Sequence, residues 1–195
     1  MQLIGCGILK REIALLAERN GWAIEADYLP PVLHVDPSSL EKGLREGLAR
    51  HPPGAMVFYG QCHPGMDRMV SEARAFRSRG QNCIEMLLGP DRYMREAEAG
   101  AFFLLEAFAE GWDEAILRTF GGNPEIAAEI LGLSCRHFLC LRTPCSGDYS
   151  AKAGEISQKT GLPLVWTDVR LDHLESVMKA LISAAAEGPA ALPAA

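Results

Sequence analysis

Short apolar segments alternate with amphipathic segments along this chain, and that alternation limits the folds open to it. Apolar runs too short for buried helices are typical of strands, whereas apolar residues three and four positions apart are typical of helices. The strand-like runs lie at residues 2–6, 22–28, 55–60, 138–141 and 164–166. This pattern favours an α/β fold with an open, mostly parallel sheet and helices on both faces. We expect a single domain over residues 1–186 and a disordered Ala/Pro tail at 187–195.

Local signals predict where several elements begin. Ser38 and Glu41 have the spacing of a capping box directly after Asp36-Pro37, which indicates a helix start. Asn82 favours a helix over 83–88 by acting as its cap, although so short an apolar run also suits a strand. A short strand is expected within 74–79. The aromatic residues of segment 101–118 are expected to form helix core rather than a stacking platform.

Composition excludes several classes of protein. The 195 residues carry a formal net charge of −6, so no general positive field attracts phosphate backbones, and we expect no nucleic-acid partner. The first residues lack the basic region and cleavage site of a signal peptide. No run of about 18 apolar residues occurs, which predicts that the chain does not span a membrane. The expected location is therefore cytoplasmic.

Three cysteines stand where a parallel sheet presents its ligands. Six cysteines in 195 residues are too sparse for a disulfide-stapled secreted scaffold. Cys6 and Cys62 each follow a predicted strand, and ligands of open parallel sheets sit at the carboxyl ends of strands. Cys83 joins them from the start of a helix, where the helix N-terminus favours a thiolate. We expect the three sulfurs to converge within one coordination sphere; the alternative is that each is a small buried hydrophobe.

The other cysteines are weaker candidates. Cys135 lies in a connection and Cys140 within a core strand, whereas Cys145 lies in a strand-end loop that could approach the same edge. The chain has no Cys-x-x-Cys pair, which argues against a zinc ribbon or a thioredoxin-type motif. We expect these three cysteines to be dispensable for metal binding.

Two histidines and one glycine pair complete the set of candidates. His63 directly follows Cys62 and could act as a fourth ligand or a proton carrier, while His34 ends the second predicted strand. The alternative for both is an exposed or hydrogen-bonded histidine without a ligand. Gly5-Cys6-Gly7 lacks the third glycine of a dinucleotide fingerprint, so no Rossmann cofactor is expected.

The order and context of the three cysteine segments resemble a known family. The segments are LIGCGILKREI at 3–13, YGQC at 59–62, NCIEMLLG at 82–89 with Arg92-Tyr93, and the glycine-aromatic stretch at 100–112. Together they resemble the bacterial and archaeal family called Domain of Unknown Function 1638. The resemblance implies that Cys6, Cys62 and Cys83 form a joint site, and that the protein is associated with corrinoid-dependent methyltransferase systems. The chain departs from the pattern at Ala101, where the resemblance leads us to expect Thr.

These observations support three hypotheses about function. The leading one is a protein that binds a metal ion, such as zinc, or an iron–sulfur cluster through Cys6, Cys62 and Cys83, with one coordination position open for chemistry. His63 and Glu85 are its candidate proton carriers. The second is a non-catalytic accessory protein that binds or delivers a corrinoid or metal to a methyltransferase partner. The third is a metal-free enzyme with a nucleophilic cysteine and His63 as its base.

Overall fold

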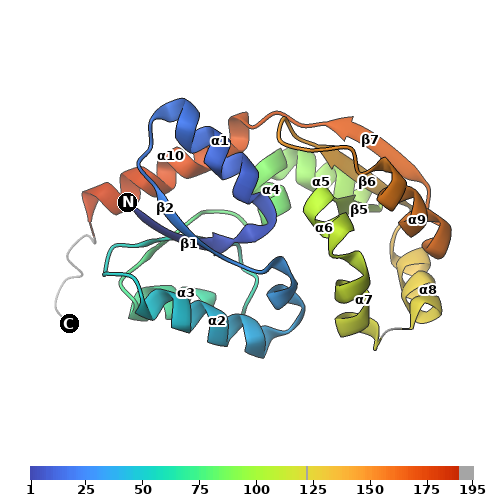
Figure 1. The fold of residues 1–195 in the computed structure, drawn as a ribbon, viewed down its shortest axis with the longest axis horizontal. Helices are drawn as coiled ribbons and strands as arrows, with labels where there is room; N and C mark the ends of the chain where they lie inside the picture. The colour runs from blue at the N-terminus through green and yellow to red at the C-terminus, as the bar shows by residue number, and fades with distance from the viewer. Residues whose placement is uncertain (122, 189–195) are drawn as a thin grey trace.

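The structure is a computed structural model that describes residues 1–121 and 123–188, and it confirms the alternation of strands and helices (Figure 1). The strands are β1 (Gln2–Cys6), β2 (Glu25–Leu29), β3 (Met56–Phe58), β4 (Phe76–Arg77), β5 (Ala101–Leu104), β6 (His137–Arg142) and β7 (Leu164–Asp168). The α-helices are α1 (Lys10–Asn20), α2 (Pro37–Ala49), α3 (Met66–Glu72), α4 (Cys83–Leu88), α5 (Pro90–Glu98), α6 (Glu106–Glu110), α7 (Trp112–Phe120), α8 (Pro124–Ser134), α9 (Ser150–Thr160) and α10 (Asp172–Glu187). Short 3-10 helices lie at η1 (Gly7–Leu9) and η2 (Pro31–Val35).

The strands divide into two parallel sheets. The first has the order β2-β1-β3-β4 and the second has the order β5-β6-β7. The predicted α/β class and parallel pairing are confirmed, but the strands do not form the one sheet that we expected. The reason lies at β4, which has two residues and therefore offers few ladder hydrogen bonds to a further strand. The chain continues from there into α4 and α5, and β5 then pairs with β6.

Helix α10 joins the two halves of the molecule, of which the first contains the sheet β2-β1-β3-β4 and the second contains the sheet β5-β6-β7. It follows β7 of the second sheet and returns to the first, where Figure 1 shows it alongside α1. Leu174 and Met178 of α10 are fully buried in the same apolar cluster as Leu3 and Ile4 of β1. Because fully burying one such side chain contributes about 1.5–3 kcal/mol, this packing holds the halves together.

The start of α2 differs from the sequence-based expectation. Asp36, not Ser38, is the cap residue, and its carboxylate accepts hydrogen bonds from the Ser38 amide and the Ser39 hydroxyl. Pro37 occupies the first helical position, so the cap must precede it. Glu41 lies one turn further on and pairs with Arg45 instead of reaching back.

The segment at 101–118 is not the continuous helix core that we expected. Its first four residues form β5, which pairs with β6, and only then do α6 and α7 follow. Gly100 adopts φ +81°, which ends the α5 segment and lets the apolar run continue as a strand. Phe102 of β5 meets Trp112 of α7 edge to face at 5.9 Å and Phe138 of β6 at 5.4 Å, so the aromatic residues do form core, between a sheet and helices.

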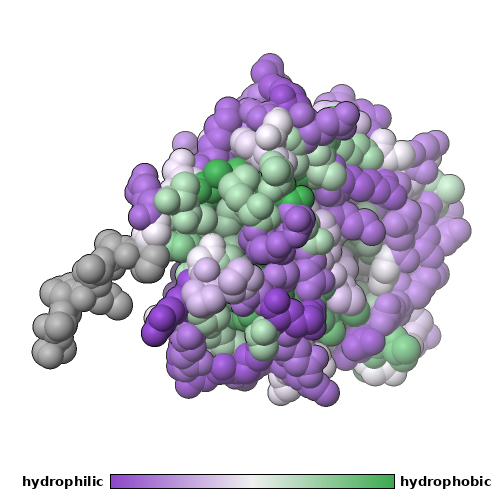
Figure 2. Space-filling view, turned by 60° about the vertical axis from the view of Figure 1, so that its left-hand side comes forward, coloured by the Kyte–Doolittle hydropathy of each residue, from purple (hydrophilic) through white to green (hydrophobic). Residues whose placement is uncertain are grey.

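Hydrophilic residues cover most of the face shown in Figure 2, and hydrophobic residues form smaller areas between them. Over residues 1–121 and 123–188, no helix has the length and apolar character needed to cross a membrane. The predicted disordered tail began at residue 187. Glu187 is instead the last residue of α10, and residues 189–195 lie outside the described part of the chain.

Candidate functional site

Cys6, Cys62 and Cys83 line one cavity of about 380 Å³, which we call the thiol cavity. The structure therefore brings together the three cysteines that the sequence analysis selected. A third of the cavity's lining residues are aromatic, and they come from both halves of the molecule. The aromatic lining residues are Phe58, Tyr59, Tyr93, Phe102, Phe103 and Phe108.

Each cysteine reaches the cavity from a different element. Cys6 is the last residue of β1, Cys62 follows β3, and Cys83 is the first residue of α4. β1 and β3 are adjacent and parallel in the first sheet, so their carboxyl ends lie at the same edge. This arrangement confirms the strand-edge placement from which we expected the thiols to converge.

Gly60 allows the segment of Cys62 to lie directly against that of Cys83. A Cβ atom at Gly60 would stand 2.2 Å from the carbonyl oxygen of Gln81, closer than any real contact. The neighbouring Gln61 amide donates a hydrogen bond of 2.7 Å to the same carbonyl. Only glycine permits this backbone approach, which sets the separation of the two cysteines.

Asn82 fixes the orientation of Cys83 and of one wall. Its side-chain oxygen accepts a 2.9 Å hydrogen bond from the Glu85 amide, which confirms the predicted cap of α4. Its side-chain nitrogen donates a 2.9 Å hydrogen bond to the hydroxyl of Tyr93. Tyr93 in turn stacks on Phe103 of β5 with ring centroids 5.3 Å apart. One asparagine thus connects the cysteine at the helix start to the wall shared by α5 and the second sheet.

The three thiols are protonated at neutral pH. Burial raises the pKa of Cys6 to about 11, and the backbone amide of Ile8 offsets only part of that effect. Burial also raises the pKa of Cys62 and of Cys83. The proximity of Cys62 adds to the effect on Cys6, and both of these thiols add to the effect on Cys83. Ionisation of one thiol would therefore oppose ionisation of the next, unless a cation lay between the thiolates.

The cavity does not contain a ready-made coordination sphere. Within the described part of the chain, no three His, Cys, Asp or Glu side chains are placed so that they could hold a metal ion as they stand. No sulfur–sulfur distance decides whether the three thiols can share one coordination sphere, so that expectation stays a prediction. Neutral thiols do not attract one another, so no force draws the sulfurs together until a metal displaces their protons.

The two candidate proton carriers lie outside the lining of the thiol cavity. The Nδ1 atom of His63 accepts a hydrogen bond from the Gly65 amide, and its Nε2 atom lies 3.8 Å from a carboxylate oxygen of Glu41 on α2. Glu85 lies in the first turn of α4. The roles assigned to His63 and Glu85 stay predictions.

Of the remaining candidates, only His34 borders the cavity. Its Nδ1 atom forms a hydrogen bond with the carbonyl oxygen of Pro31. Cys140 is fully buried within β6, and burial raises its pKa to about 11. Cys135 and Cys145 are half-buried and do not line the thiol cavity.

Tyr59 is the lining residue that the sequence reasoning missed. It is 2 % exposed, and its hydroxyl has no hydrogen-bond partner among the described residues. Burial and the neighbouring Cys6, Cys62 and Cys83 all raise the pKa of this hydroxyl. Its signal in the sequence was its place directly after the buried strand β3, at the same edge that drew attention to Cys62.

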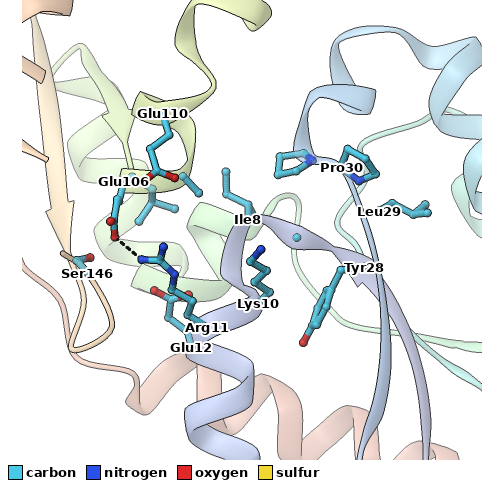
Figure 3. A pocket seen from close by; sticks show the side chains of 14 residues that line it. Ile8, Lys10, Arg11, Glu12, Tyr28, Leu29, Pro30, Glu106, Glu110 and Ser146 are labelled. Carbon is cyan, nitrogen blue, oxygen red and sulfur yellow. Dashed lines mark hydrogen bonds and ion pairs between the residues drawn. The ribbon is translucent and has the colours of Figure 1, made fainter. Parts of the chain in front are cut away.

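A second cavity, which we call the polar cleft, shares the lining residues Ile8 and Leu105 with the thiol cavity. Figure 3 shows the polar cleft from close by. The polar cleft has a volume of about 400 Å³, and Figure 3 shows the side chains of α1, β2 and α6 that surround it. Its charged lining residues are Lys10, Arg11, Glu12, Glu106 and Glu110.

Three of the five charged side chains of the polar cleft have a polar side-chain partner. Arg11 of α1 lies 2.8 Å from Glu106 of α6, as the dashed line in Figure 3 marks, and Glu106 also accepts a 2.9 Å hydrogen bond from the Gly147 amide. The buried Glu12 accepts a 2.6 Å hydrogen bond from the Thr143 hydroxyl. These contacts join the first half of the molecule to the second.

A protein-family model described as "Protein of unknown function (DUF1638)" matches residues 28–178. The chain belongs to the DUF1638 family. The match confirms the resemblance that the cysteine segments suggested, and it includes Cys62 and Cys83 while beginning after Cys6. The DUF1638 description names no activity, so it leaves the chemistry of the thiol cavity to be argued from the residues.

No curated protein matches the chain. Two solved structures resemble it at low sequence identity. One is a sugar transporter from Clostridium phytofermentans, with 10 % identity, coverage of 94 % of this chain and 93 % of that one, and a TM-score of 0.39. The other is the transcription regulator CcpA of Lactococcus lactis, with 12 % identity, coverage of 98 % and 94 %, and a TM-score of 0.43. Likeness at this level identifies no ligand or activity for the DUF1638 protein.

Proposed function

We propose that the thiol cavity binds a soft metal centre, either a zinc ion or an iron–sulfur cluster, through Cys6, Cys62 and Cys83. The observation that supports this proposal is that cysteines from three separate elements border one cavity. Thiolates are preferred ligands of zinc and of iron–sulfur clusters. The cavity is lined mainly by apolar residues.

Three protein ligands leave one coordination position open. Structural zinc sites usually close with four protein ligands, whereas three leave room for water or a substrate, and a cluster held by three cysteines exposes one iron. The open position would face the rest of the cavity. Such a centre suits the activation of a thiol or methyl acceptor, which fits the association with corrinoid-dependent methyl transfer that the family resemblance implies.

The upward shift of the thiol pKa values favours a metal site over a metal-free nucleophile. A nucleophilic cysteine needs a depressed pKa, whereas burial raises the pKa of all three thiols. His63, the base of that mechanism, also lies outside the cavity lining. A bound cation removes both difficulties, because it stabilises the thiolates directly and replaces their protons.

Metal analysis of anaerobically purified protein tests the proposal most directly. We expect about one zinc ion per chain, or iron and sulfide with visible absorption. Cys62→Ala should lose most of the metal, because two thiolates hold a metal poorly. Cys135→Ala is the matched control, since Cys135 is also half-buried but lies outside the cavity, and it should retain the metal. Equal metal loss in both variants, or wild-type protein that takes up neither zinc nor a cluster, would overturn the proposal.

Thermal stability gives an independent readout. The three cysteines are far apart in sequence, so the unfolded chain cannot assemble the site, and metal should bind the native state preferentially. At a thousandfold excess of metal over Kd, this linkage raises the free energy of unfolding by about 4 kcal/mol. The Cys62→Ala protein should melt like metal-free wild type with or without metal. Identical melting of loaded and metal-free wild type would support the alternative that the thiols are core cysteines.

The second candidate function is an accessory protein that delivers a metal or corrinoid to a methyltransferase partner. It is favoured by one observation, which is that His63 and Glu85 both lie outside the cavity lining. An enzyme needs a positioned proton carrier, whereas a carrier protein does not. Zinc exchange with a competing chelator separates the two. A carrier should release zinc within seconds to a competitor, while a catalytic site should retain its metal over many turnovers.

A further inference from the structure

The thiol cavity is much larger than a metal site requires. Metal–sulfur bonds are about 2.3 Å long, so an ion bound to three thiolates fills a small part of about 380 Å³. That volume lies within the range typical of small-molecule sites, about 300–1,000 Å³. The remaining space is bounded by aromatic rings from both halves of the molecule, including Tyr93 of α5 and Phe103 of β5, which stack on each other.

The lining selects against charged ligands. Among the described residues that border the thiol cavity there is no Lys, Arg, Asp or Glu, and the charged side chains gather instead in the polar cleft. An ionised ligand group would find no Lys, Arg, Asp or Glu side chain in this lining to pair with, which disfavours it. A neutral, largely apolar molecule pays no such penalty and gains from burial against the aromatic wall.

The hydroxyl of Tyr59 supplies the specific contact. It is buried, lies close enough to the three thiols for them to affect its pKa, and has no hydrogen-bond partner among the described residues. A buried hydroxyl without a partner is costly, so its retention needs a reason. Tyr93 differs, because its hydroxyl already accepts a hydrogen bond from Asn82. Of these two lining tyrosines, Tyr59 is therefore the one whose hydroxyl makes no hydrogen bond within the described residues.

We propose that the thiol cavity binds a small, uncharged, largely apolar organic molecule carrying a hydrogen-bond acceptor, and that the Tyr59 hydroxyl donates a hydrogen bond to that acceptor. This inference rests on the proposed function for the metal centre beside which the molecule lies. It assigns the class of substrate that the open coordination position would meet, and it makes Tyr59 the residue that orients the substrate.

A pair of probes of nearly equal shape tests the inference. Acetophenone carries a carbonyl oxygen, and α-methylstyrene has a methylene group in its place. We would titrate each into reduced, metal-free protein and follow the methyl resonance of Met86, which lines the cavity, with the exposed Met94 as a reference. Wild type should bind acetophenone about five- to tenfold more tightly than α-methylstyrene, the factor expected for one hydrogen bond.

Tyr59→Phe removes only the hydroxyl. It should abolish this preference, because it weakens the binding of acetophenone and leaves the binding of α-methylstyrene unchanged. The variant should fold, because it deletes a buried polar atom that lacks a partner. Tyr28→Phe, which removes a hydroxyl from the polar cleft, is the matched control and should keep the preference. The inference is overturned if neither probe shifts the Met86 resonance, if wild type shows no preference, or if Tyr59→Phe retains it.

Zinc binding, measured separately on the same proteins, separates this inference from the proposed function. Tyr59→Phe should bind zinc as wild type does, because the hydroxyl is not a ligand. Zinc binding without probe binding refutes the substrate assignment alone. Probe binding by protein that takes up neither zinc nor an iron–sulfur cluster refutes the proposed metal site, and with it the placement of the substrate beside a metal.

Discussion

The thiol cavity and the polar cleft share Ile8 and Leu105 and have similar volumes, but their polar groups are organised in opposite ways. In the polar cleft, Arg11 pairs with Glu106 and Glu12 with Thr143, so the charges stabilise the contact between the two halves. In the thiol cavity, three protonated cysteines and Tyr59 belong to a mainly apolar lining, and the Tyr59 hydroxyl has no partner among the described residues.

This difference shows which of two neighbouring cavities is the better candidate for a ligand. Paired charges satisfy one another, and a ligand that disrupted them would first have to compensate for their loss. Buried groups without partners carry a cost in the free protein that a ligand can remove. The thiol cavity therefore has more to gain from a ligand, although the polar cleft holds more charge. Four predictions test this contrast, beginning with the largest effect.

The first prediction concerns the pH dependence of zinc affinity. Zinc binding must displace protons from thiols whose pKa values burial has raised. Each proton released makes the affinity rise about tenfold per pH unit, or up to about a thousandfold for three protons. Calorimetric titration between pH 6 and 8 measures the slope. Cys83→Ala should lower it by one proton, whereas Arg11→Ala in the polar cleft should leave it unchanged. A slope near zero in wild type would contradict the assignment of thiol ligands.

The second prediction concerns the glycine that sets the cavity's shape. Gly60→Ala would place a Cβ atom against the Gln81 carbonyl, and the resulting displacement should cost about 3 kcal/mol in the free energy of unfolding. It should also weaken metal binding, since it moves Cys62 away from Cys83. Gly154→Ala is the control, because nothing lies within 4 Å of its Cβ position in α9, and it should gain about 0.5–1 kcal/mol. Urea denaturation gives both values, and a neutral Gly60→Ala would show that the backbone contact is not tight.

The third prediction concerns the stability of the metal-free protein in alkaline solution. The native pKa of Cys6, about 11, is above its ordinary value of 9.0. The native state then binds more protons than the unfolded state, so the stabilising contribution is complete below pH 9 and is lost as the pH rises toward 11. This loss amounts to about 2 kcal/mol. In urea titrations, Cys6→Ala should show a smaller decline over this range than wild type, and parallel declines would argue that Cys6 is not buried as described.

The smallest effect is expected from the ion pair of the polar cleft. Arg11 is half exposed, and exposed ion pairs contribute little to stability and are screened by salt. Arg11→Ala should lower the melting temperature slightly at low ionic strength and not at all in about 0.5 M salt. A large decrease that persists in salt would mean that the polar cleft, and not α10 packing, holds the two halves together.

Much of the fold was predictable because its signals are local. The short strands, the Asn82 cap of α4 and the αL glycine that ends α9 depend on neighbouring residues, so periodicity and capping chemistry identify them. The errors came where distant partners decide. Ala101–Leu104 is a strand because β6 pairs with it, and the division into two sheets depends on the two-residue length of β4. Neither is readable from an apolar run alone.

For the candidate site, the sequence by itself determined that Cys6, Cys62 and Cys83 lie at strand and helix ends, because ligand edges follow from element order. Only the tertiary structure decided what surrounds them. Four of the thiol cavity's six aromatic lining residues come from β5, α5 and α6, elements distant in sequence from Cys6, and His63 lies outside the lining with its Nε2 atom 3.8 Å from Glu41. The free hydroxyl of Tyr59 is likewise a property of packing, because whether a buried donor has a partner depends on atoms that chain neighbours do not supply.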